Sequence, residues 1–410
     1  MPTSFQLPEA FLWGASTAAH QIEGMNVNSD FWAFEHSGLL PERFREMSGD
    51  ACDSYHRWRE DMDLLAELGF TDYRFSIEWA RIEPAPGEFS NAEIAHYRRM
   101  VAGAIERGLR PMLTLHHFTV PRWFDEQGGW ESEDAVELFG RFVEAAAPIF
   151  ASNVDHICTI NEPNMVARFA AIRKAVLAGN VWEEVGTDKY DEAATVALIN
   201  AHRRAVGVIR RLTPHIKVGW SVAIANHHAV DGGELKAAEI ASAARDVFVL
   251  AADGDDWIGV QAYTRVFVGP DGQLPVPEGA QKTLTGWEYY PPALGESIRS
   301  VARLVPRTPI IVTENGIAES DDAVRVAYTS GALAGMRDAL AAGIDIRGYY
   351  HWSALDNYEW GSFVPTFGLI AVDRKTFVRT PKPSAAWLGA AGQSRAIELI
   401  SDDLMSESVV

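Results

Sequence analysis

Two glutamates stand where the sequence predicts that buried strands end. Glu162 lies in Thr-Ile-Asn-Glu-Pro at residues 159–163, and Glu314 lies in Thr-Glu-Asn-Gly at residues 313–316. Hydrolysis of a glycosidic bond with retention needs one protonated and one ionised carboxyl, roughly 5 Å apart. For either glutamate alone, a role as a helix cap or as the partner of a surface cation would be favoured. Because both stand at strand ends, which meet at one mouth in a parallel barrel, the pair favours glycoside hydrolysis.

The two motifs belong to a chain-long alternation of short β-rich runs and longer segments with helical spacing. Helical segments include residues 134–150, 191–211 and 321–342. This order predicts an α/β fold, a single (β/α)8 TIM barrel over residues 1–400 with its active site at the C-terminal ends of the strands. Residues 401–410 are expected to form a flexible tail. Eight strands are predicted, at residues 11–16, 72–79, 110–117, 155–163, 216–223, 257–264, 309–316 and 347–356.

The connection between the sixth and seventh predicted strands, residues 265–304, is unusually long. It is rich in Gly and Pro and carries Trp287, Tyr289 and Tyr290, which we expect to be exposed. Loops of this length usually carry function or are disordered. We therefore expect this loop to form a wall of the pocket.

Composition limits the classes of partner. The formal net charge is −20, which argues against nucleic acid, anionic membrane and polyanionic substrates, because these attract clustered Lys and Arg. No apolar run of about 18 residues and no basic segment followed by an apolar leader occurs. We expect a cytoplasmic protein. A homo-oligomer stays open, because no sequence feature specifies an interface.

The cysteines and histidines point to no metal or disulfide chemistry. Cys52 and Cys158 cannot build a disulfide framework, and Cys158 is expected to be a buried thiol inside a strand. His116 and His117 hint at a metal, but no spaced His and Asp ligand set accompanies them. We expect neither a metal nor another cofactor.

Three further motifs accompany the two glutamate motifs. Residues 11–24 read Phe-Leu-Trp-Gly-Ala-Ser-Thr-Ala-Ala-His-Gln-Ile-Glu-Gly, residues 73–79 read Tyr-Arg-Phe-Ser-Ile-Glu-Trp, and residues 351–360 read His-Trp-Ser-Ala-Leu-Asp-Asn-Tyr-Glu-Trp. With these motifs the chain resembles family 1 of the glycoside hydrolases, the β-glucosidase and β-galactosidase family, from residue 11 almost to residue 388. The resemblance implies a β-glycoside as substrate.

The resemblance also implies roles for single residues. Glu162 would be the general acid/base and Glu314 the nucleophile. Asn161 would hydrogen-bond the sugar 2-hydroxyl, a contact that strengthens in the transition state. Arg74 and Tyr263 match positions that orient the nucleophile, and a neighbouring Arg is expected to lower the pKa of a carboxyl. For Arg74 the alternative is a purely structural ion pair, which is compatible with this role.

Other residues match the sugar site of the family. Taken singly, His117 would more often be a core histidine, and Trp352 or Trp360 core filling. Trp287 resembles an aromatic platform for the leaving group, with ordinary loop packing as the alternative. Glu359 would bridge the 4- and 6-hydroxyls, and its charge would repel a 6-phosphate. The residues matching the glycone subsite are Gln21, His117, Trp352, Glu359, Trp360 and Phe367.

Four departures from the family pattern concern the pocket walls. Phe118-Thr119 replaces a Trp and an acidic residue, and Gln261-Ala262 precedes Tyr263 in place of Asn-Tyr. Residues 168–186 lack the usual Gly- and Pro-rich loop, and a stretch before Trp257 is missing. The first two departures affect fine sugar preference. The last two are expected to open the leaving-group side to bulky or apolar aglycones.

The leading interpretation is a retaining exo-β-glycosidase, foremost a β-glucosidase, that releases unphosphorylated glucose, galactose or fucose through a covalent intermediate on Glu314. Transglycosylation at the same site is one alternative. A carbohydrate-binding protein on the same scaffold is another, since fold does not imply function, but the presence of both glutamates disfavours it. A metal-dependent barrel hydrolase is the third.

Overall fold

The computed structural model describes residues 3–42, 45–151, 153–180 and 189–400. Eight parallel strands close into a barrel in the order β11-β12-β2-β3-β4-β5-β6-β8. All eight predicted strands are confirmed, and so is the (β/α)8 barrel. The single-domain assignment stays a prediction, and the expected tail lies outside the described residues. The barrel strands are β2 (Leu12–Ser16), β3 (Asp72–Ser76), β4 (Arg110–His116), β5 (His156–Asn161), β6 (Lys217–Ala223), β8 (Trp257–Gln261), β11 (Ile310–Glu314) and β12 (Ile346–Trp352).

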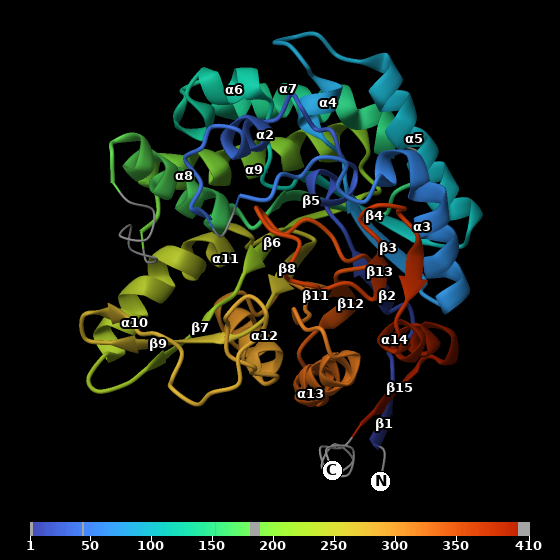
Figure 1. Cartoon of the computed structure of the whole chain (residues 1–410), viewed down its shortest axis with the longest axis vertical. Helices are drawn as coiled ribbons and strands as arrows, with labels where there is room; N and C mark the ends of the chain where they lie inside the picture. Colours follow the sequence, from blue (N-terminus) through green and yellow to red (C-terminus); the bar gives the residue numbers. More distant parts are fainter. Residues whose placement is uncertain (1–2, 43–44, 152, 181–188, 401–410) are drawn as a thin grey trace.

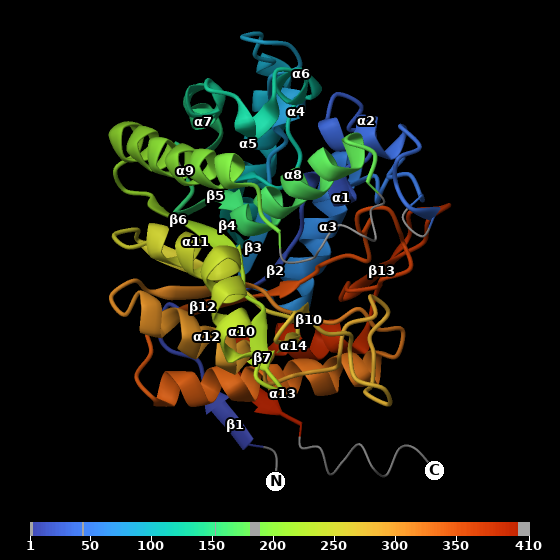
Figure 2. The same ribbon diagram turned by 90° about the vertical axis from the view of Figure 1, so that its left-hand side faces the viewer.

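Helices surround these strands (Figures 1 and 2). The predicted helices at 134–150, 191–211 and 321–342 correspond to α7, α9 and α13. The longer helices are α3 (Ser54–Leu68), α5 (Asn91–Glu106), α7 (Ala135–Phe150), α8 (Pro163–Leu177), α9 (Glu192–Leu212), α12 (Ala293–Leu304), α13 (Asp322–Ala341) and α14 (Pro383–Ser394). The shorter ones are α1 (Ala19–Ile22), α2 (Asp30–Glu35), α4 (Trp79–Ile82), η2 (Gly129–Glu131), α6 (Arg122–Glu126), α10 (Glu234–Ala241), η4 (Ser242–Asp246) and α11 (Val247–Ala251).

Burial on both faces explains why the strands read as nearly continuous apolar runs. The outer faces pack against the helices in one large core. Six side chains, each from a different barrel strand, form a separate cluster, and side chains from these six strands can meet only inside the barrel. The cluster consists of Leu12, Met112, Cys158, Trp257, Ile311 and Tyr350. Cys158 is therefore the buried thiol that was predicted. Cys52 is a second buried free thiol, and burial raises its pKa to about 12.

The prediction of one continuous loop over residues 265–304 was wrong. β9 (Arg265–Gly269) pairs in parallel with β7 (Asn226–Ala229) and antiparallel with β10 (Gly272–Gln273), and α12 fills the end of the segment. Pairing outside the barrel gives β9 a partner that local sequence does not indicate. Of the three aromatics expected to be exposed, only Trp287 is, whereas Tyr289 and Tyr290 are half-buried.

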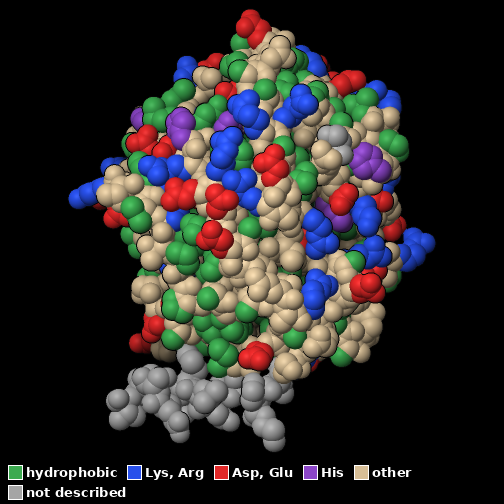
Figure 3. Space-filling model, turned by 90° about the vertical axis from the view of Figure 1, so that its right-hand side faces the viewer, with side chains coloured by type: hydrophobic (Ala, Val, Ile, Leu, Met, Phe, Trp, Pro, Cys, Tyr) green, Lys and Arg blue, Asp and Glu red, His purple; other side chains and the backbone are tan. Residues whose placement is uncertain are grey.

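Two small strand pairs also lie outside the barrel. β1 (Thr3–Gln6) pairs antiparallel with β15 (Ala396–Leu399), next to the N-terminal end of β2. β13 (Ile370–Val372) pairs with β14 (Arg379–Pro381). On the face that carries α3 and α5, acidic and basic side chains are intermingled (Figure 3). None of the helices in the described part of the chain is long and apolar enough to cross a membrane.

Candidate active site

A cavity of about 1300 Å³ opens at the C-terminal ends of the barrel strands. The last residues of β6, β8, β11 and β12 line it, as do residues directly after β4 and β5. Arg74 and Asn161 do not line the cavity but lie buried behind it. The fold thus brings together all the residues predicted for the site. Those that line the cavity are Gln21, His117, Glu162, Tyr263, Trp287, Glu314, Trp352, Glu359, Trp360 and Phe367.

Both carboxylate oxygens of Glu314 are held by hydrogen bonds. Arg74 Nη1 donates to Oε1 at 2.7 Å, and the Tyr263 hydroxyl donates to Oε2 at 2.6 Å. The guanidinium of Arg74 is fully buried. A carboxylate with one fixed cation and one fixed hydroxyl has little freedom to rotate, so its position is set before any substrate arrives.

The same arginine connects Glu314 to Asn161. Arg74 Nη2 donates to Asn161 Oδ1 at 2.5 Å, and Gln261 Nε2 donates to the same oxygen at 2.8 Å. The amide nitrogen of Asn161 therefore faces His117, with 3.3 Å between Nδ2 and Nε2. Since an amide nitrogen only donates, His117 Nε2 accepts and its Nδ1 carries the proton.

Glu162 has a different environment. It is the residue before α8, in the left-handed region with φ 45°, and its backbone N–H donates to Ser221 O at 2.7 Å. Non-glycine residues in this region cost on the order of 1–3 kcal/mol and cluster at functional sites. Its carboxyl is half-buried and has no hydrogen-bonding partner among the described residues. It is therefore free to exchange a proton with a bound molecule.

The environments separate the two carboxyls electrostatically. Burial raises the pKa of Glu162 well above its ordinary value, and the charge of Glu314 adds to that rise. Burial also raises the pKa of Glu314, but Arg74 and Tyr263 oppose it there. As expected, Arg74 acts to lower this pKa, but desolvation outweighs the ion pair, so the net shift is upward. The order survives: Glu162 holds its proton to higher pH than Glu314.

Polar groups without partners are available on one side of the cavity. Gln21 Nε2 donates to Tyr358 O at 2.9 Å, whereas Gln21 Oε1 and His117 Nδ1 lack partners within the described structure. Burial and the charge of Arg74 lower the pKa of His117 well below its usual range, so the ring is neutral. A free acceptor and a free donor beside the carboxyls suit sugar hydroxyls.

Glu359 is the third carboxyl of the cavity. Trp352 Nε1 donates to its Oε1 at 3.2 Å. Burial raises the pKa of Glu359 well above its usual range, Glu314 adds to the rise, and Trp352 and Gln21 oppose it. The cavity therefore brings three carboxyl groups together, Glu162, Glu314 and Glu359.

Aromatic rings form two walls. The His117 ring is nearly parallel to those of Trp352 and Trp360, with centroids 5.8 and 6.4 Å away. Phe367 lies 5.9 Å from Tyr263 on another wall. Flat apolar faces of this kind match the C–H face of a pyranose.

Within the described part of the chain, no three His, Cys, Asp or Glu side chains are grouped as metal ligands would be. A sequence model described as Glycosyl hydrolase family 1 matches residues 3–254 and 270–395. The chain belongs to glycosyl hydrolase family 1. It is a glycoside hydrolase of the β-glycosidase type, as the resemblance implied.

Relatives of this family 1 glycosyl hydrolase carry consistent names. Thermostable beta-glucosidase B of Thermobispora bispora is 31% identical, over 93% of this chain and 89% of its own length. Beta-glucosidase of Agrobacterium sp. is 31% identical, over 94% and 95%. The crystal structure of the beta-glycosidase BGL167 superimposes with a TM-score of 0.87 at 43% identity, covering 95% of this chain and 97% of that one.

One of the expected departures is itself part of the family 1 site. Residues 255–269 lie between the two matched stretches and contain Gln261 and Tyr263. Gln261 was expected only to affect fine sugar preference, yet its Nε2 donates to Asn161 Oδ1 at 2.8 Å. The position of this Gln at the end of a predicted barrel strand could have indicated that it belongs to the site. Of the expected difference at residues 168–186, the part from 181 lies outside the described residues, and α8 occupies most of the rest.

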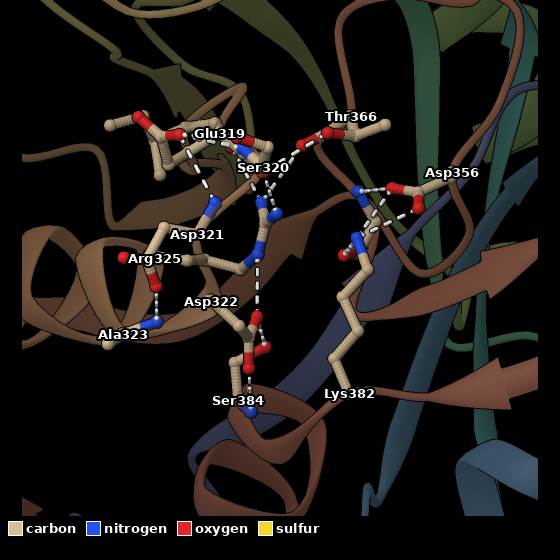
Figure 4. Close-up of polar contacts among 12 residues, drawn as sticks. Glu319, Ser320, Asp321, Asp322, Ala323, Arg325, Asp356, Thr366, Lys382 and Ser384 are labelled. Carbon is tan, nitrogen blue, oxygen red and sulfur yellow. Dashed lines mark hydrogen bonds and ion pairs between the residues drawn. The ribbon is translucent and has the colours of Figure 1, made fainter.

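Arg325 was also missed, because a lone Arg on a predicted helix resembles a surface charge. It is 1% exposed, and its Nη1 donates to Ile317 O at 2.8 Å and to Thr366 O at 3.0 Å. Figure 4 shows the guanidinium of Arg325 between these two loops. One loop follows Glu314 and the other precedes Phe367, so Arg325 ties together two segments that carry cavity residues.

Proposed function

We propose that this enzyme is a retaining exo-β-glycosidase, foremost a β-glucosidase, with Glu314 as nucleophile and Glu162 as general acid/base. The contrast between the two carboxyls carries the proposal. Glu314 is held by two donors, whereas Glu162 has no hydrogen-bonding partner in the described structure and a strongly raised pKa. A fixed, ionised carboxylate suits attack, and a free, protonated one suits proton donation.

The reaction then has two balanced steps. In the first, Glu314 Oε attacks the anomeric carbon, the glycosidic bond breaks, and the Glu162 proton passes to the departing oxygen. In the second, Glu162 takes a proton from water, whose oxygen displaces Glu314 from the anomeric carbon. This transfer restores the protonated form of Glu162, and the sugar leaves with its original configuration. Arg74 and Tyr263 hold Glu314 in place in both steps.

The side chains around the carboxyls support a terminal glucose as the released unit. Gln21 Oε1 and His117 Nδ1 are free for hydroxyls, the Glu359 carboxyl offers further acceptor capacity beyond its bond from Trp352, and Trp352 offers an apolar face. The names of the relatives from Thermobispora and Agrobacterium point to glucosides as well. Galactosides differ from glucosides at the 4-position and fucosides at both the 4- and 6-positions, and both are secondary candidates.

The direct test is hydrolysis of 4-nitrophenyl β-glucoside, β-galactoside and β-fucoside, with the first-formed anomer identified by proton NMR. We expect the β-anomer of glucose to appear first. Among the three substrates, the glucoside should give the highest kcat/KM. Initial release of the α-anomer would rule out retention. A chain that binds these glycosides without cleaving them would be a carbohydrate-binding protein.

The pH profile of kcat/KM is expected to be bell-shaped, with both limbs above the ordinary Glu range of about 4.3. Activity falls as pH drops through the pKa of Glu314, which must be ionised, and as pH rises through that of Glu162, which must be protonated. Glu162→Gln should remove the basic limb of the residual activity on a dinitrophenyl glucoside. Glu78→Gln is the control, because burial raises the Glu78 pKa to about 8 although Glu78 does not line the cavity. If Glu78→Gln lost the basic limb and Glu162→Gln kept it, Glu162 would not be the group that must be protonated.

Discrimination against phosphorylated sugars is also expected. Where Glu359 is ionised, a phosphate charge about 4 Å from its carboxylate costs about 4 kcal/mol at an effective dielectric constant of 20, or about 10³-fold. We expect kcat/KM for 4-nitrophenyl 6-phospho-β-glucoside to be about 10³-fold below that for the plain glucoside. Glu359→Gln should reduce this difference between the two substrates, and it should also lower kcat/KM for the plain glucoside. Comparable turnover of both substrates by the wild type would refute the prediction.

A further inference from the structure

Large hydrophobic side chains that remain exposed gather at the mouth of the cavity. Isolated exposed hydrophobics are normal, but a contiguous group around a cleft marks a binding surface. Six of the sixteen exposed large hydrophobics in the described structure line this one cavity. We call these six residues the apolar rim: Phe169, Leu177, Leu274, Leu284, Trp287 and Val364.

Two aromatic series connect the apolar rim to the carboxyls. On one side, Phe169 packs against Phe118 with centroids 5.7 Å apart, and Phe118 packs edge-on to Trp360 at 4.9 Å. On another, Trp287 lies 5.6 Å from Tyr263, whose hydroxyl bonds Glu314. Apolar surface therefore continues from the mouth to the point where the glycosidic bond would be cut.

Charged side chains at the mouth are already paired. Arg265 makes two bonds to Glu288, at 2.8 and 2.7 Å, and Arg173 Nη2 donates to Asp125 Oδ2 at 2.6 Å. Lys174 Nζ donates to Glu131 at 3.0 Å. A second sugar at this position would need free directional partners, and these ion pairs leave few.

The Arg265–Glu288 pair also fixes the rim. Thr264 Oγ1 donates to Glu288 O at 2.9 Å, so two residues directly after Tyr263 hold the segment that carries Trp287. Residues 264 and 265 lie in the stretch that the family model does not match. The cavity of about 1300 Å³ exceeds the ~300–1,000 Å³ of pockets for drug-sized ligands. There is room for a sugar and a large leaving group.

We propose that the apolar rim binds an extended apolar aglycone, so that the natural substrates are β-glycosides of apolar alcohols rather than oligosaccharides. This inference rests on the proposed function, because it names the leaving group of the same reaction. Glycone recognition stays with the polar groups near Glu359. The rim adds affinity in proportion to the apolar area that the leaving group buries.

The test compares methyl, butyl, hexyl and octyl β-glucosides with cellobiose, all below micelle-forming concentrations. One fully buried methylene contributes about fourfold, so we expect kcat/KM to rise along the alkyl series by about two- to fourfold per methylene and then level off. Cellobiose should lie well below the octyl glucoside. A flat alkyl series, or cellobiose equal to or better than octyl glucoside, would overturn the proposal while leaving β-glucosidase activity established.

A matched pair of double variants localises the effect. Leu284→Ser with Val364→Ser removes two rim side chains, whereas Leu212→Ser with Val378→Ser removes two of similar exposure away from the cavity, 38% against 38% for Leu and 62% against 56% for Val. The rim variant should lower the octyl-to-methyl ratio of kcat/KM at least tenfold, and the control should keep it. Equal ratios in both variants would refute the role of the rim.

Binding of non-hydrolysable octyl and methyl 1-thio-β-glucosides gives a readout that does not need turnover. Tighter binding of the octyl compound, lost in the rim variant only, supports the apolar site. If the wild type hydrolyses no glycoside yet binds the octyl compound in this way, the proposed function fails and the apolar site stands. Equal affinity for both compounds overturns the site itself.

Discussion

Replacing Glu314 by Ala is expected to lower kcat/KM for aryl β-glucosides roughly 10⁴- to 10⁶-fold, as deletion of other enzymatic nucleophiles does. The reason is that Arg74 and Tyr263 would then fix no nucleophile, and no covalent intermediate could form. Azide should restore activity, because it fits the space left by the carboxylate and attacks the anomeric carbon directly. A single displacement inverts configuration, so the product should be the α-glycosyl azide.

The control must separate chemistry from folding. Removing one partner of the buried Arg74–Glu314 pair leaves an uncompensated charge, which is strongly destabilising in buried pairs. Glu314→Gln keeps hydrogen-bonding atoms in place and should be equally inactive with a smaller loss of thermal stability. Glu60→Ala, on the outer surface of α3, should behave like the wild type. Substantial activity in Glu314→Gln, or a β-glycosyl azide from Glu314→Ala, would contradict the nucleophile assignment.

Replacing Glu162 by Ala is expected to lower kcat/KM by about 10² to 10⁴-fold, the usual contribution of a general acid or base. The loss should depend on the leaving group. A dinitrophenolate can depart without receiving a proton, but an alkoxide must be protonated as it departs. The variant should therefore lose more activity on alkyl glucosides than on dinitrophenyl glucosides. Azide needs no general base and should accelerate breakdown of the Glu314 intermediate, giving the β-glycosyl azide.

The opposite stereochemistry of the two azide products is the sharpest discriminator between the carboxyls. Both variants are assayed under identical conditions, and the products are assigned by proton NMR from the coupling constant of the anomeric proton. If Glu162→Ala gave the α-azide and Glu314→Ala the β-azide, the two roles would be exchanged. An equal loss on alkyl and dinitrophenyl glucosides in Glu162→Ala would argue against proton donation by this residue.

The barrel could be predicted because its signal is local. Each strand is a short apolar run buried on both faces, and each is followed by a segment with helical spacing. The two glutamates proposed as catalytic could be located for the same reason, since strand ends are visible in sequence. β9 could not be predicted as a strand, because its parallel partner β7 is distant in sequence and outside the repeating barrel pattern, and its nearby partner β10 has only 2 residues.

Contacts among site residues were harder to predict than their membership of the site. Arg74 was expected to act on Glu314, but its bond to Asn161 and the bond from Gln261 depend on side-chain directions that only the closed barrel fixes. The net direction of the pKa shift at Glu314 could not be predicted for a related reason. Sequence shows the neighbouring cation but not the depth of burial, and burial decides the outcome here.

The pairing of β1 with β15 makes the chain nearly circular in space. Thr3 lies opposite Leu399 and Gln6 opposite Ala396, so the two outer strands run alongside each other. Neither strand contributes a residue to the cavity. A short linker across this strand pair would allow circular permutation, with new termini cut in an exposed loop. Attachment of the enzyme to a solid support through either strand would likewise leave its substrate entrance facing the solution.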